Sequence, residues 1–110
     1  MQLGQVLRSR GTNRSGGTFD PVTVQLVWMK GTPVPGQDTS QVRKDACGAV
    51  MHRSQYGNTG STFGWEVDHI QPVSKGGGDA IANLQPLQWE NNRGKGDDWP
   101  HWSCTVTWRG

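Results

Sequence analysis

The amino-acid sequence predicts a small α+β domain that is rich in tryptophan and in loops, and three observations support this expectation. The chain has 110 residues, enough for one compact domain that buries roughly two thirds of its unfolded surface. It contains 16 Gly and 6 Pro, which argues against a helical bundle and favours short strands joined by turns. Six Trp supply the apolar area that the low content of aliphatic side chains does not.

In the first half of the chain we expect a basic arm, one strand and one short helix. Residues 1–18 are polar and rich in Gly, Ser and Arg, so we expect a flexible basic arm there, followed by a single domain at residues 19–110. Residues 22–28 alternate in polarity with period 2, which predicts a strand. The apolar spacing in residues 41–52 is compatible with a short helix, although Gly48 weakens that prediction.

The second half predicts a ββα unit at about residues 64–96. Residues 65–70 (WEVDHI) have the composition of a strand, and residues 83–87 (NLQPL) predict a second, shorter one. Residues 88–95 (QWENNRGK) predict a helix of two turns. A last strand is expected at residues 105–108 (TVTW).

Charge and hydropathy exclude a membrane protein. Basic residues predominate in residues 1–53 and acidic residues in residues 54–110, while the net charge is only +2. The longest apolar run is too short to span a bilayer, and no signal peptide is visible. We therefore expect no membrane partner and a cytoplasmic location, with delivery as a toxin as an open alternative.

The two cysteines, Cys47 and Cys104, are far apart in the chain and form no CxxC pair. Three interpretations stay open. Because no export signal is visible, free buried thiols come first. The alternatives are a disulfide and a structural zinc site that also uses His52 and His101.

Four polar residues of the ββα unit supply complementary chemistry. Asp68 offers a hard oxygen ligand for a divalent cation, and Asn92 offers a neutral oxygen from the helix. His69 carries an imidazole, a group whose ordinary pKa of about 6.5 lets it accept a proton from water. An imidazole needs an acceptor at its other nitrogen to fix the tautomer, and we expect Asn83 to provide this directly or by fixing the loop.

For Asp68 and His69 to act at one site, the predicted strand must depart from regular geometry. Asp68 and His69 are neighbours in a predicted strand, where adjacent side chains point to opposite faces. We therefore expect a bulge or a sharp twist at the end of that strand. Three basic residues complete the candidate site, because Arg93 and Lys95 at the end of the helix, and Lys75 beside three glycines, supply positive charge for phosphate.

These segments, WEVDHI, then PVSKGG, DAIANL and NNRGK, resemble the HNH endonuclease family, whose core is a ββα-metal fold. The longer pattern is similar to small stand-alone HNH proteins. The resemblance implies a metal-dependent endonuclease that hydrolyses DNA phosphodiester bonds. It implies that Asp68 and Asn92 are metal ligands, that His69 is the general base and that Asn83 orients His69.

At the third motif position the family name implies His, whereas this chain has Asn92. An amide oxygen shifts the expected cation toward Mg²⁺ or Mn²⁺ and away from Zn²⁺ or Ni²⁺. The resemblance further implies a one-metal mechanism, nicking with little sequence specificity, and duplex or single-stranded DNA as partner, within a phage, restriction or toxin system. Two alternatives remain: a non-catalytic nucleic-acid-binding module on the same scaffold, and a small structural protein stapled by zinc.

Overall fold

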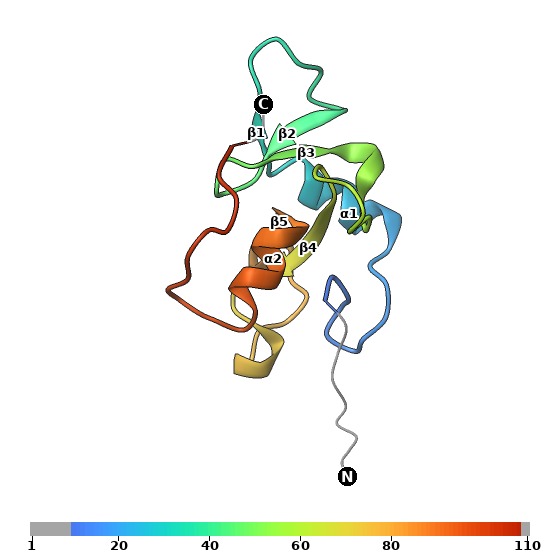
Figure 1. Ribbon diagram of the computed structural model, residues 1–110. Helices are drawn as coiled ribbons and strands as arrows, with labels where there is room; N and C mark the ends of the chain where they lie inside the picture. Colours follow the sequence, from blue (N-terminus) through green and yellow to red (C-terminus); the bar gives the residue numbers. More distant parts are fainter. Residues whose placement is uncertain (1–9, 109–110) are drawn as a thin grey trace.

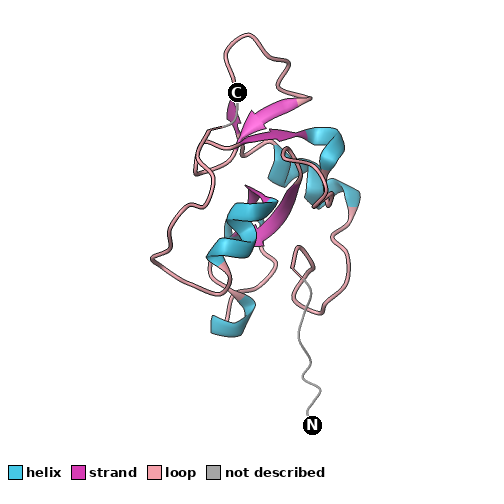
Figure 2. Ribbon diagram, viewed as in Figure 1, coloured by secondary structure: helices cyan, strands magenta, loops and turns pink. Residues whose placement is uncertain are grey.

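The computed structural model describes residues 10–108 and has the predicted α+β class (Figures 1 and 2). Two antiparallel sheets are present, one with the order β1-β2-β3 and one that pairs β4 with β5. The elements are α1 (Pro21–Trp28), β1 (Thr32–Pro33), β2 (Val42–Lys44), β3 (Val50–His52), η1 (Arg53–Gln55), β4 (Trp65–His69), η2 (Val73–Lys75), η3 (Ile81–Asn83), β5 (Leu84–Gln88) and α2 (Trp89–Lys95). Among the described residues, neither α-helix has the length needed to cross a bilayer.

The predicted ββα unit is confirmed as β4, β5 and α2. The two strands pair without interruption from Trp65 opposite Gln88 to His69 opposite Leu84. The bulge expected in this strand is therefore wrong. Helix α2 follows β5 directly, since the side chain of Gln88 caps it by accepting hydrogen bonds from the N–H groups of its first turn.

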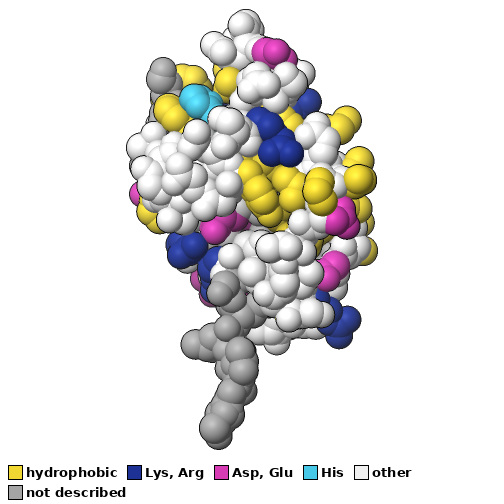
Figure 3. Space-filling view, turned by 90° about the vertical axis from the view of Figure 1, so that its right-hand side faces the viewer, with side chains coloured by type: hydrophobic (Ala, Val, Ile, Leu, Met, Phe, Trp, Pro, Cys, Tyr) yellow, Lys and Arg dark blue, Asp and Glu magenta, His cyan; other side chains and the backbone are white. Residues whose placement is uncertain are grey.

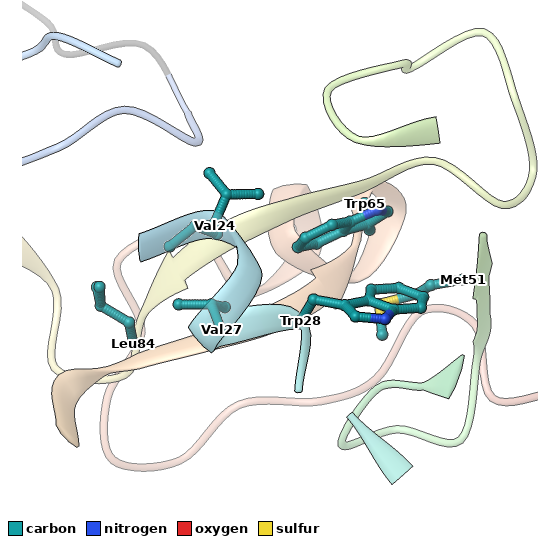
Figure 4. Packing of buried hydrophobic residues seen from close by; sticks show 7 residues of the cluster. Val24, Val27, Trp28, Met51, Trp65 and Leu84 are labelled. Atoms are coloured by element: carbon teal, nitrogen blue, oxygen red, sulfur yellow. The ribbon is translucent and has the colours of Figure 1, made fainter. Parts of the chain in front are cut away.

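Helices α1 and α2 cover opposite faces of the β4–β5 sheet (Figure 4). The α1 face carries the hydrophobic core, in which the rings of Trp28 and Trp65 lie 5.1 Å apart. The core cluster comprises Val24, Val27, Trp28, Met51, Trp65, Val67 and Leu84. Because this face is filled by apolar side chains, the polar residues of β4 that point the other way meet α2.

The strand predicted at residues 22–28 is wrong, because this segment forms α1. Asp20 caps the helix, its side chain accepting a hydrogen bond from the N–H of Thr23 at 2.8 Å. Pro21 occupies the first turn, where its missing N–H costs nothing. The cap and the proline outweigh the alternating pattern of Val and Thr.

The helix predicted at residues 41–52 is also wrong, because β2 and β3 form an antiparallel pair there. Asp45 organises the connecting loop, since its carboxylate accepts hydrogen bonds from the N–H groups of Cys47 and Ala49, each at 2.9 Å. Gly48 has a φ of +84°, a value that glycine adopts without strain. A helix cannot contain that turn.

Residues 105–108, predicted as a strand, are an irregular tail that returns to the three-stranded sheet (Figure 1). A disulfide between Cys47 and Cys104 fastens the tail to the loop between β2 and β3. The free-thiol interpretation is therefore wrong, and so is the zinc site, because both sulfur atoms are bonded to each other. The ammonium group of Lys44 lies 4.9 Å from the ring of Trp108.

The predicted basic arm is described only in part. Residues 1–9 lie outside the described residues. Residues 10–18 contact the domain, because Arg10 forms an ion pair with Asp97 and the backbone N–H of Arg14 donates to Asp79. The domain boundary at residue 18 stays a prediction.

Candidate functional site

A polar pocket opens at the end of the β4–β5 sheet, and three separate parts of the chain contribute to it. The residues that line it are Arg10, Gly11, Val67, Asp68, His69, Pro72, Asn92, Gly96 and Asp97. The pocket thus brings together three predicted site residues, Asp68, His69 and Asn92. Asn83 is not among its lining residues.

Successive side chains of strand β4 point to opposite faces of the sheet. Asp68 points to the α2 side, where it meets Lys95, and Glu66, two residues earlier, meets Asn92. His69 points to the α1 side, where its ring lies 5.8 Å from that of Phe19. Asp68 and His69 therefore lie on opposite faces of a regular strand and both reach the pocket because it lies at the end of β4.

The Asp68 carboxylate is buried, and both of its oxygen atoms have partners. Gln85, directly opposite on β5, donates to Oδ2 at 2.9 Å. Lys95 donates to Oδ1 at 3.3 Å and to the backbone oxygen of His69 at 2.9 Å. Burial raises the pKa of Asp68 above its ordinary value, and the contacts with Gln85 and Lys95 offset only part of this rise. Gln85 and Lys95 therefore compensate the burial of this carboxylate only in part.

Asn92 is 2% exposed and presents its amide in one orientation. Its Nδ2 donates to Oε1 of Glu66 at 2.9 Å, and because a carboxylate only accepts hydrogen bonds, the nitrogen must face Glu66. Arg93 holds Glu66 in turn, with a nitrogen–oxygen distance of 3.1 Å. Oδ1 of Asn92 is left without a hydrogen-bond donor among residues 10–108, which is unusual for a buried polar atom.

A divalent cation fits this arrangement. Asn92, which has an unpaired side-chain oxygen, and Asp68 line the same pocket, and hard oxygen ligands are those that Mg²⁺ and Mn²⁺ prefer. In the part of the chain that is described, no three His, Cys, Asp or Glu side chains gather as a zinc site would require. Asp68 and Asn92 are therefore residues that would hold a cation such as Mg²⁺ or Mn²⁺.

His69 is held by a residue that the sequence analysis did not select. Its Nε2 lies 2.7 Å from Oδ1 of Asp79, and the same carboxylate accepts a hydrogen bond from the backbone N–H of Arg14 at 2.9 Å. Because a carboxylate accepts the Nε2 proton, Nδ1 is the nitrogen that can take up a further proton. Asp79 thus makes the contact that was expected of Asn83.

Asn83 braces the loop, the second of the two roles expected of it. Its Nδ2 donates to the backbone oxygens of Gln71 and Gly78, and its Oδ1 accepts from the N–H of Gln71. Gly77 leaves the space for this, because a Cβ there would lie 2.9 Å from Nδ2 of Asn83. Asn83 therefore fixes the segment that leads to Asp79 and acts on His69 only through that loop.

The three predicted phosphate-binding residues have different surroundings. Lys95 is 1% exposed and engaged by Asp68, so its ammonium does not face solvent. Arg93 is about half exposed but is paired with Glu66. Lys75 is exposed on η2 and does not line the pocket. Direct phosphate contact by Lys95 does not fit its burial.

The sequence analysis did not select Glu66, Asp79 or Arg10 as site residues. Period-2 alternation contained a signal for Glu66, which shares a face with Asp68. Asp79 comes ten residues after His69 across an irregular loop, and Arg10 lies before α1. No local pattern places these two beside the strand end.

A comparison with protein families bears on the ββα unit. A family model described as HNH endonuclease matches residues 47–98. This range includes β3, β4, β5 and α2 with Asp68, His69, Asp79 and Asn92, whereas Arg10 lies outside it. No curated protein and no solved structure gives a significant match.

Proposed function

Because the chain belongs to the HNH endonuclease family, a family of nucleases, we propose that it hydrolyses phosphodiester bonds in DNA with one divalent cation. The observation that carries this proposal is the unpaired Oδ1 of buried Asn92, which lines the same pocket as Asp68 and His69. A purely structural asparagine would have this oxygen satisfied. Here it is available to a ligand.

Asp68 and Asn92 are the residues that would hold the cation, with Mg²⁺ or Mn²⁺ as the expected ions. Such a cation supplies positive charge to a phosphate whose charge grows in the transition state. Glu66 keeps Oδ1 of Asn92 directed away from itself. Gln85 keeps the Asp68 carboxylate in place from the neighbouring strand.

His69 acts as the general base. Its Nε2 is engaged by Asp79, so that Nδ1 accepts the proton of the attacking water. The Asp79 carboxylate also stabilises the imidazolium that results, as carboxylates beside catalytic histidines do. Since the described pocket holds one such base, the enzyme cuts one strand at a time and leaves nicks. We expect little sequence specificity.

The test is nicking of supercoiled plasmid by wild type and His69→Ala in Mg²⁺, Mn²⁺, Zn²⁺ or chelator. Wild type should nick in Mg²⁺ and Mn²⁺ and not in chelator, and His69→Ala should be slower by about 10²- to 10⁴-fold. His101→Ala is the matched control, because His101 is exposed and does not line the pocket. Plasmid binding by wild type without nicking under any of these conditions would instead favour the non-catalytic binding module.

A further inference from the structure

The segment that precedes α1 contributes to the pocket although it lies outside the family match. Arg10 and Gly11 line the pocket directly. Gly11 lies so close to Glu66 that a Cβ on it would be 3.3 Å from Oε2 of that residue. Arg10 and Gly11 therefore belong to the site together with the ββα unit.

The charges around the pocket single out Arg10. The pocket lining includes the acidic residues Asp68 and Asp97. Arg10 is the one arginine or lysine among the described residues that line the pocket. Neither basic residue of α2 lines the pocket, since Lys95 is buried against Asp68 and Arg93 pairs with Glu66. A phosphodiester that enters this pocket carries a negative charge, so the guanidinium of Arg10 is the protein cation positioned to meet it.

The guanidinium is held at the rim of the pocket and remains accessible. Nη1 pairs with Oδ1 of Asp97 at 3.1 Å, and the Arg10 side chain is 31% exposed. Nη2 lies 3.4 Å from the position that a Cβ on Gly96 would take, so the glycine at the end of α2 leaves room for it. A guanidinium has five N–H donors in a planar fork that matches phosphate oxygens. The pair with Asp97 uses Nη1 and orients this fork.

We propose that Arg10 is a catalytic residue that binds a non-bridging oxygen of the scissile phosphate. This inference rests on the proposed nuclease function and extends it to a residue before the family domain. The DNA phosphate would lie between the cation held by Asp68 and Asn92 and the guanidinium of Arg10. Both charges then act on the group that becomes more negative in the transition state.

The experiment compares Arg10→Ala with Arg14→Ala. Each variant removes one positive charge from the same segment, but the Arg14 side chain is exposed and the contact of this residue with Asp79 comes from its backbone N–H, which the substitution keeps. At saturating plasmid, Arg10→Ala should nick about 10²-fold more slowly than Arg14→Ala. DNA affinity in chelator, measured by fluorescence anisotropy, should fall by the same small factor in both variants. Arg10→Lys should recover part of the rate, since it restores the charge but not the fork.

Each outcome is decisive. Equal nicking rates of Arg10→Ala and Arg14→Ala beside an active wild type would overturn the role of Arg10 and leave the proposed function intact. A wild type that does not nick with any metal would overturn both. Should Arg10→Ala unfold, Arg10→Gln retains the length of the side chain, and the same rate difference from Arg14→Ala is expected.

Discussion

Two neighbouring residues of α2, Asn91 and Asn92, are both fully buried and yet have opposite surroundings. Nδ2 of Asn91 donates to Asp45 and to the backbone oxygen of Val106, and its Oδ1 accepts from the N–H groups of Thr105 and Val106. The amide of Asn91 is saturated on both sides. It serves to close the tail over the helix.

Asn92 has only half of its amide engaged. Nδ2 is bound by Glu66, whereas no donor among residues 10–108 reaches Oδ1. Residue type and burial are the same in both asparagines, so neither property separates a structural residue from a functional one here. The count of satisfied polar atoms does, because an unpaired buried oxygen costs free energy unless a ligand binds it. Substitutions of Asn91 and of Asn92 can therefore test the structural role and the functional role separately.

The largest effect on stability is expected from Asn91→Ala. The substitution leaves the N–H groups of Thr105 and Val106 without their acceptor and removes a donor from Asp45, which is 4% exposed. With about 1–3 kcal/mol for each unsatisfied group, the free energy of unfolding should fall by about 3 kcal/mol or more. Urea denaturation measures this loss. A loss below about 1 kcal/mol would contradict the structural role assigned to Asn91.

A somewhat smaller loss is expected from opening the disulfide. Cys47 and Cys104 enclose a separation of 57 residues, and removing a link of this kind typically costs about 2–4 kcal/mol. The variant Cys47→Ser/Cys104→Ser should unfold at correspondingly lower urea concentration. Wild type in reductant should match it, and the double variant itself should not respond to reductant. A stability equal to that of oxidised wild type would show that Asn91 alone secures the tail.

The second half of the chain was far more predictable from sequence than the first. Strands β4 and β5 and helix α2 follow one another closely, and each is built from local patterns. In the first half, the alternation in residues 22–28 was overruled by the cap of Asp20. Residues 41–52 form two strands because Asp45 and Gly48 turn the chain between them. Caps and turns depend on single side chains, which periodicity does not detect.

The candidate site also has a part that the sequence predicts and a part that it does not. Asp68, His69 and Asn92 belong to contiguous motifs, and the pocket brings them together as expected. The residues that contact them come from other segments: Asp79 from a glycine-rich loop and Lys95 from the last turn of α2. Arg10, from before α1, lines the same pocket and pairs with Asp97. The sequence predicted Lys95 as a phosphate-binding residue, whereas the structure buries its ammonium group against Asp68. Such pairings are set by tertiary packing, which the sequence does not display locally.

The smallest effect on stability and the clearest effect on function are expected from Asn92→Ala. The substitution removes one hydrogen bond to Glu66, which Arg93 continues to hold, so the free energy of unfolding should change by about 1 kcal/mol or less. A cation that binds the folded state raises the unfolding temperature. The unfolding temperature of each variant is measured with and without Mn²⁺. Mn²⁺ should raise it for wild type and for Asn91→Ala, each compared with the same protein without Mn²⁺. It should not raise the unfolding temperature of Asn92→Ala. If Asn92→Ala kept the full rise, Oδ1 would not be a cation ligand, and the difference between the two asparagines would lie in packing alone.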